Sequence, residues 1–152
     1  MRAEIDVSLL FKKAIKEYEE KYGKMTFSFR KEKDHFVFTS INDSLLNLLR
    51  IDRNEFVGKS LEDDISCIGH DLNRLLKEVY PLAWNGNTIV FYCIPSTNKD
   101  TLLIATLAPK FSNKKVNEVL GSCVPLSKEE FNEELITLEN LKSFIIIKQE
   151  KS

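Results

Sequence analysis

The stretch that decides the fold is "FVFTSINDSLLNLLRIDRNEFVGKSLEDDI", residues 36–65. Aromatic and β-branched residues alternate at its start, which predicts a strand over 35–41. A run of leucines follows directly and predicts a short helix over 42–49. Asn42 or Asp43 can cap that helix, because either side chain accepts a hydrogen bond from a free backbone N–H of the first turn. The sequence therefore predicts a strand that leads straight into a short capped helix.

A second helical turn is predicted over 52–58. Asp52 and Glu55 are three residues apart, as in a capping box with Asp in place of Ser or Thr. Gly58 stands where this turn should end, because glycine is the residue that most readily stops a helix. We therefore expect the chain to change direction at Gly58.

The tripeptide Gly58-Lys59-Ser60 also ends the motif of a phosphate-binding loop. That motif needs another glycine five residues before Gly58, and this chain has Arg53 there. The loop must also follow a buried strand and open a long helix, whereas the residues before Gly58 have a helical pattern. We therefore interpret Gly58 as a helix stop, and Lys59 and Ser60 as parts of a solvated turn.

Outside this stretch, the pattern of apolar residues separates helices from strands. Apolar residues recur three and four positions apart in three further segments, and we expect helices at 6–22, 70–86 and 128–142. Alternation and β-branched residues predict four further strands, at 25–30, 87–94, 101–108 and 116–126. The last helix would open at a capping box formed by Ser127 and Glu130, although residues 143–152 could instead be extended. Pro81 should kink or end its helix near Leu82, because proline lacks a backbone donor.

This order of elements predicts an α+β fold. A hairpin comes first and a three-stranded meander last, which suggests one five-stranded antiparallel sheet with helices packed on one face. Flanking helices would stand at the N- and C-terminal ends. We expect three parts: an amphipathic helix at 1–23, a domain at 24–126, and a helix with a tail at 127–152.

Over residues 24–126, about two thirds of the chain, the sequence resembles a PAS domain. In that family a strand leads into an Asn-containing short helix that ends in paired leucines, followed by a turn reading Glu-Phe/Leu-Val/Ile-Gly-Lys. The matching positions are Asn42, Leu48, Leu49 and 55–59. "AWNGN", 83–87, looks like the family's Ala-x-x-Gly turn, and "LLIATLAPKFSNKKVNEVLGSCVPLS", 102–127, looks like its last two strands. The ending at 124–127 departs from the family's usual Asp-Ile-Thr, at the junction that usually relays a signal.

The resemblance implies a sensory or protein-interaction module of signal transduction, with a small cavity cupped between sheet and helices. The residues that we expect around this cavity are Phe38, Leu46, Leu49, Ile65, Leu76, Phe91 and Leu103. Alternatively, these side chains simply fill the core, as close packing would require. A small-molecule ligand or a signalling partner protein bound at the cup would shift the packing of the flanking helices, a population shift.

The resemblance also implies a homodimer, because an N-terminal helix often dimerises in such domains. The helix predicted at 6–22 has an apolar stripe that must be covered by its own domain or by a second chain. The dimer contacts that we expect are Leu10, Phe11, Ile15 and Tyr18.

Composition argues against several classes of protein. The 152 residues carry a net charge of −1, so no basic surface for nucleic acid is indicated. The N-terminus lacks a signal-peptide pattern, and the apolar run 144–147 is far too short to span a membrane. The cysteines are odd in number and widely spaced, at Cys67, Cys93 and Cys123. This spacing argues against a disulfide framework or a zinc site, and it favours reduced thiols in a cytoplasmic protein. The Met1 start and polar end fit a complete small protein, and a fragment of a longer signalling protein is the alternative.

Residues with chemical potential are few. His70 opens the predicted helix at 70–86, and in some haem-binding PAS domains a histidine on this helix ligates iron, so a haem-charged sensor is an alternative. Cys67 stands in "ISCIGHD", which does not match the Asn-Cys-Arg-Phe-Leu-Gln stretch of flavin-binding relatives. The acidic run 62–64 reads as a solvated face, or at most a weak site for a divalent ion. Because no poised pair or triad is present, we expect neither catalysis nor a metal site.

Overall fold

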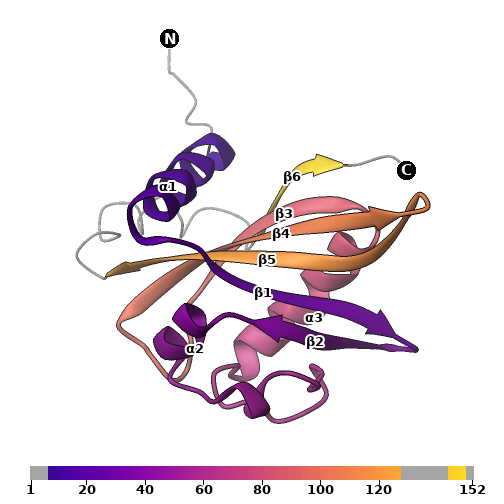
Figure 1. The fold of residues 1–152 in the computed structure, drawn as a ribbon, viewed down its shortest axis with the longest axis horizontal. Coiled ribbons are helices and arrows are strands. Elements are labelled where there is room, and N and C mark those ends of the chain that lie inside the picture. Colours follow the sequence, from indigo (N-terminus) through magenta and orange to yellow (C-terminus); the bar gives the residue numbers. More distant parts are fainter. Residues whose placement is uncertain (1–6, 128–143, 150–152) are drawn as a thin grey trace.

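The computed structural model describes residues 7–127 and 144–149 (Figure 1). Its elements in chain order are α1 (Val7–Tyr22), β1 (Met25–Glu32), β2 (His35–Ile41), α2 (Asp43–Leu49), the short 3-10 turn η1 (Arg53–Glu55), α3 (His70–Trp84), β3 (Asn87–Cys93), β4 (Thr101–Ser112), β5 (Lys115–Ser127) and β6 (Phe144–Gln149). The α+β class is thereby confirmed. The helix predicted at 128–142 and its capping box lie outside the described residues.

All strands lie in one antiparallel sheet with the order β2-β1-β5-β4-β3-β6. The five strands expected from the sequence are present. The expected number of strands is corrected by a sixth strand, β6, at the edge of the sheet. β6 pairs with β3 from Asn87↔Gln149 to Phe91↔Phe144, so the alternative of an extended C-terminal segment holds for 144–149. The apolar run at 144–147 is explained by this strand.

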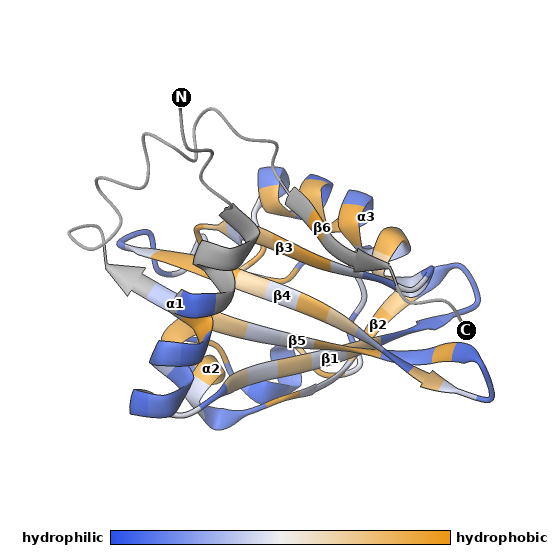
Figure 2. Ribbon diagram, turned by 90° about the horizontal axis from the view of Figure 1, so that it is seen from above, coloured by the Kyte–Doolittle hydropathy of each residue, from blue (hydrophilic) through white to orange (hydrophobic). Residues whose placement is uncertain are grey.

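The core lies between one face of the sheet and α2, η1 and α3. On β4 the side chains of Leu103, Ala105 and Leu107 belong to this core, whereas the alternating Leu102 and Ile104 point to the opposite face. Leu102 and Ile104 are nevertheless buried, so the middle of the sheet is apolar on both faces. Figure 2 shows hydrophobic residues along β3 and on α3, with polar residues gathered at the hairpin ends.

Helix α1 lies on the side of the sheet opposite to α2 (Figure 1). Ile15 and Glu19 of α1 share a groove with Thr106 of β4 and Ser122 of β5. Thr106 and Ser122 are directly opposite each other in the β4–β5 register and point away from the core. The helices therefore cover both faces of the sheet.

Helix α2 is fixed to β1 through its cap. The Asn42 side-chain oxygen accepts from the backbone N–H of Leu45 at 3.1 Å and from that of Thr26 at 3.2 Å. The Asn42 amide donates to the Lys24 carbonyl at 2.7 Å. Arg50 then ends the helix in the left-handed conformation, with φ of 59°. One asparagine thus satisfies the helix start and also aligns it with the neighbouring strand.

The segment 58–60 has a structural role at the edge of the sheet. The backbone N–H of Gly58 donates to the Phe38 carbonyl at 2.8 Å, and the N–H of Phe38 donates to the Lys59 carbonyl at 2.9 Å. Gly58 has φ of 85°, where glycine avoids the strain of other residues. Ser60 corrects the expectation of a fully solvated turn. It is half-buried, bridges to β2, and its N–H donates to the Asp63 carboxylate at 2.8 Å.

Several boundaries differ from the sequence prediction, most clearly those of α3, β4 and β5. α3 continues through Pro81 and ends at Trp84, two residues before the expected end of the 70–86 helix, so of the two alternatives for Leu82 the helix end is wrong. Pro81 is exposed in the last turn, where the carbonyl left without its partner can be hydrated. β4 and β5 are longer than expected and meet at Asn113-Lys114, whose φ values of 53° and 67° form a tight two-residue turn.

Candidate functional site

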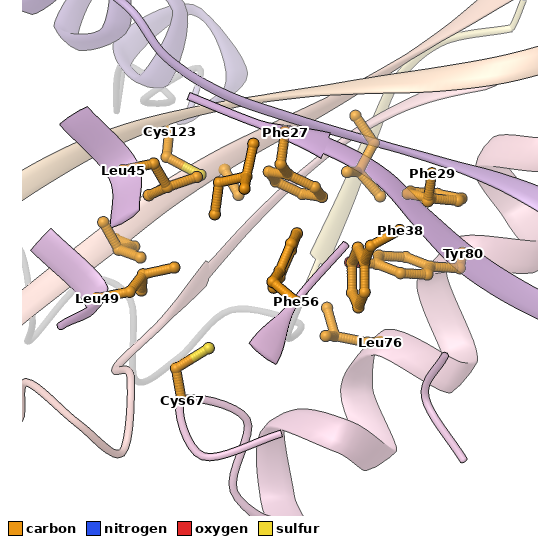
Figure 3. Packing of buried hydrophobic residues seen from close by; sticks show 14 of the residues in the cluster. Phe27, Phe29, Phe38, Leu45, Leu49, Phe56, Cys67, Leu76, Tyr80 and Cys123 are labelled. Atoms are coloured by element: carbon orange, nitrogen blue, oxygen red, sulfur yellow. The ribbon is translucent and has the colours of Figure 1, made fainter. Parts of the chain in front are cut away.

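An internal cavity of 60 Å³ lies between the inner face of the sheet and the helices. Its wall consists of aliphatic and aromatic side chains and three thiols, without any charged residue. Figure 3 shows the surrounding side chains converging from β1, β2, β5, α2, α3 and the loop before α3. The site is therefore built by the packing of the whole domain and not by one motif.

The sheet supplies one side of the cavity. Because successive side chains alternate across a strand, only every second residue can reach it. The residues from the sheet are Phe27 on β1, Phe38 on β2, Phe91 and Cys93 on β3, Leu103 and Ala105 on β4, and Cys123 on β5. In the centre, Ala105 and Cys123 are paired across β4 and β5. Their small side chains leave the space that a leucine would fill.

Helices and connections supply the opposite side. The residues are Leu45 and Leu49 on α2, Phe56 after η1, Cys67 and Ile68 before α3, Leu72, Leu76 and Tyr80 on α3, and Pro95 after β3. On α3 the spacing of four residues places Leu72, Leu76 and Tyr80 on one face of the helix. Ile68, Leu72 and Cys93 are only half-buried, so this end of the cavity lies nearest to solvent.

Aromatic rings pack against one another in and around the wall. Phe38 and Phe56 are stacked with centroids 4.0 Å apart, and Phe27 meets both edge-on at 6.1 and 6.2 Å. Tyr80 stacks on Phe29 at 3.9 Å. Such offset and edge-to-face arrangements add stability beyond the buried area.

The three thiols behave as apolar groups. Burial raises the pKa of Cys67 to about 11 and that of Cys93 to about 12. Burial raises the pKa of Cys123 still further. At neutral pH all three are therefore protonated, and the nucleophilic thiolate is not formed. Burial also raises the pKa of the Tyr80 phenol well above its usual value.

The β3–β4 connection closes one end of the cavity through hydrogen bonds. The backbone N–H of Ser96 donates to the Cys67 carbonyl at 3.2 Å, and its hydroxyl donates to the Ser66 carbonyl. The Thr97 hydroxyl donates to the Leu49 carbonyl. The Asn98 amide donates to the Leu48 carbonyl at 3.0 Å. Side chains of this connection thereby satisfy the last carbonyls of α2, which no residue of the helix itself can reach.

Five of the seven residues expected around the cavity line it: Phe38, Leu49, Leu76, Phe91 and Leu103. Leu46 and Ile65 are buried in the core, but they lie outside this lining. On α2 the neighbouring Leu45 takes the place expected for Leu46. The sequence pattern did not predict that the three thiols share one cavity, because they lie far apart in the chain and Cys67 stands in a connection.

His70 does not line the cavity. Its side chain is exposed, and its Nε2 lies 3.0 Å from an Arg74 guanidinium nitrogen one turn further along α3. Among the acidic residues, Glu62 forms an ion pair with Lys77 at 3.3 Å, and the Asp63 carboxylate accepts a hydrogen bond from the backbone N–H of Ser60. Within residues 7–127 and 144–149, no three His, Cys, Asp or Glu side chains are grouped to hold a metal ion.

The residues expected at a dimer contact lie on α1. Ile15 and Tyr18 are half-buried, and the side chains of Leu10 and Phe11 lie outside the described part of the structure. Ile15 borders the groove toward β4 and β5, which has a volume of 380 Å³ and includes the charged Lys16 and Glu19. None of the described helices is long and apolar enough to cross a membrane.

No family model matches the sequence, and no curated protein matches it. Solved structures do match. A light-oxygen-voltage domain studied with a flavin analogue has a TM-score of 0.59 at 16% identity, covering 90% of this chain and 98% of that chain. The Rhodobacter sphaeroides LOV protein has a TM-score of 0.55 at 12% identity, covering 84% and 73%. A sensory box sensor histidine kinase from Vibrio cholerae has a TM-score of 0.51 at 9% identity, covering 80% and 96%.

These matches extend over most of the chain, and they agree with the resemblance seen in the sequence. Identities this low establish a common fold and do not transfer a ligand or an activity. The protein therefore has the PAS fold in the form seen in light-oxygen-voltage and sensory-box domains.

Proposed function

We propose that this chain is a PAS/LOV-type sensory module, which binds a guest in its internal cavity and has no catalysis of its own. The observation that carries the proposal is the apolar cavity at the junction of α2, α3 and the sheet. A guest at this junction contacts both the sheet and the helices α2 and α3. It can therefore favour one packing of the layers over another, which is what a sensor must do.

The sheet offers a direct route from the cavity to α1. Ala105 and Cys123 line the cavity, and the next residues, Thr106 and Ser122, face the groove under α1. Both pairs are in register on β4 and β5. A displacement of these strands by a guest would therefore change the surface on which α1 rests.

Filling the cavity by mutation tests this route. Ala105→Leu places a permanent side chain where a guest would lie, and we expect altered hydrogen exchange of the α1 amides. Val116→Leu is the control, because it enlarges a half-buried side chain that packs on the core without lining the cavity. A folded Ala105→Leu protein whose α1 amides exchange as in the wild type would contradict the proposed function.

We also propose that α1 forms part of a homodimer contact. Its contact with its own domain is a groove bordered by Lys16, Glu19, Glu20 and Lys24. One carboxylate oxygen of Glu19 and the hydroxyl of Thr106 are shielded from solvent in this region without a hydrogen-bond partner. A groove with charged borders and two unpaired polar atoms holds α1 only weakly on its own domain. This supports an additional contact between α1 and a second copy of the chain.

A further inference from the structure

We propose that the guest is a single small, uncharged and polarizable apolar molecule, and that haem, flavin and acid-bearing ligands are excluded. This inference rests on the proposed sensory function and specifies the chemical class of its ligand. Three features of the cavity define this class: the polarity of its wall, its size and the atoms that form it.

Because the wall of the cavity is apolar, a charged guest is excluded. No lining residue carries a charged side chain, and the thiols of Cys67, Cys93 and Cys123 are protonated at neutral pH. A carboxylate or phosphate would therefore lose its hydration without gaining a partner, which costs several kcal/mol or more. An apolar guest has no hydration of this kind to lose.

The size of the cavity limits the guest to a few heavy atoms. Its volume is 60 Å³. An engineered apolar cavity of roughly 150 Å³ stays dry and takes up benzene or xenon, whereas sites for drug-sized ligands span about 300–1,000 Å³. A flavin or haem would require the aromatic wall to separate, and the stacking of Phe38 on Phe56 opposes this.

The atoms of the wall favour a polarizable guest. Thiol sulfurs approach the cavity from β3, from β5 and from the loop before α3, and the rings of Phe27, Phe38 and Phe56 also line it. Sulfur atoms and aromatic rings interact favourably with polarizable partners through dispersion. Cavities lined by leucine alone lack this contribution from sulfur.

Entry is most direct at the half-buried end formed by Ile68, Leu72 and Cys93. The hydrogen bond from Ser96 to the Cys67 carbonyl crosses between the loop before α3 and the β3–β4 connection. A second bond, from the Ser96 hydroxyl to the Ser66 carbonyl, joins the same two segments. Opening both bonds would widen the path, while the apolar lining keeps polar solutes out.

Xenon is the probe for this proposal, because it is small, uncharged and polarizable. In the full chain, we expect saturable shifts of the methyl NMR signals of Leu49, Leu76 and Leu103 as xenon pressure rises. Ala105→Leu should abolish these shifts. Ala108→Leu should keep them, since it adds the same side chain to β4 outside the lining. Wild-type signals that show no saturable shift would overturn the proposal, as would shifts that persist in a folded Ala105→Leu protein.

Two further measurements sharpen the result. Cys123→Ser replaces a sulfur by a polar hydroxyl of similar shape, and we expect it to weaken xenon binding several-fold. If the folded Cys123→Ser protein binds xenon with unchanged affinity, the cysteine sulfurs do not cause the preference for a polarizable guest. Flavin mononucleotide and haemin should not bind to the wild type, and a stoichiometric complex with either would contradict the proposed ligand class.

The outcomes separate this proposal from the sensory function. If xenon binds but neither xenon nor Ala105→Leu changes the exchange of α1 amides, the ligand class stands and the sensory function fails. If Ala105→Leu changes α1 but xenon does not bind to the wild type, the sensory function stands and the ligand class fails.

Discussion

At the scale of single residues, Gly121 determines how closely Phe27 can approach β5. The two residues are paired across β1 and β5. A Cβ atom built at Gly121 would lie 2.2 Å from the Phe27 ring, far inside van der Waals contact. The missing side chain therefore makes room for an aromatic ring that lines the cavity.

Gly121→Ala should consequently destabilise the domain. The ring of Phe27 must move toward the cavity or the strands must separate, and overpacking of this kind costs about 1–3 kcal/mol. Urea denaturation measures the loss. The double variant Gly121→Ala with Phe27→Leu should recover part of it, because leucine lacks the clashing ring atoms. Equal stability of Gly121→Ala and the wild type would contradict this reading of the contact.

Individual cavity residues could be predicted where a strand or a long helix fixed their direction. Phe38, Phe91 and Leu103 follow from strand alternation, because a strand has only two faces. The error at Leu46 arose on α2, whose two turns contain too few residues to fix the orientation of the apolar stripe. Cys67 lies in a connection without any periodicity, so only the folded chain shows where it points.

At the scale of elements, the end of α2 depends on a segment distant in sequence. Thr97 and Asn98 donate to the carbonyls of Leu49 and Leu48. These bonds join the β3–β4 connection to a helix about fifty residues earlier. They hold together two elements that both contribute to the cavity wall.

Removing these donors should loosen the connection. For Thr97→Val with Asn98→Ala we expect a loss of about 1–3 kcal/mol in the free energy of unfolding, because net hydrogen-bond contributions are near 1 kcal/mol each. Hydrogen exchange should increase in 94–98 and at the end of α2. Lys99→Ala is the control, since Lys99 is exposed. Unchanged exchange in both segments would show that the bonds do not hold the connection.

Element types were predictable because local chemistry specifies them. The Asn42 cap and the Asp52–Glu55 capping box form as expected. Boundaries were less predictable, since Pro109 and charged residues interrupt the apolar pattern of β4 while the backbone ladder continues through them. β6 pairs with a strand more than fifty residues away, and its sequence alone allowed both a helix and a strand.

At the scale of the whole molecule, the domain should associate through its N-terminal helix. We expect light scattering at tens of micromolar to give a dimer for the full chain and a monomer for a version without residues 1–23. Tyr18→Ala should weaken the dimer, whereas Lys13→Ala, which alters a side chain 72% exposed, should not. A monomeric full chain at this concentration would rule out the dimer.

The strand order could not be read from the sequence, because neighbours in the sheet are set by packing between distant segments. β1 lies beside β5, although about 80 residues separate them. The order of elements predicted one antiparallel sheet, but it did not place β1 beside β5.

The pairing of residues 58–60 with β2 has a consequence for assembly. Phe38 uses both its N–H and its carbonyl on this segment, so the middle of that sheet edge cannot accept a strand from another molecule. A fibre that grows strand by strand needs two different open edges on every copy. With the β2 edge occupied, strand pairing between copies is confined to the β6 edge. Two molecules joined edge to edge in this way would be related by a two-fold axis, and growth would stop at the pair.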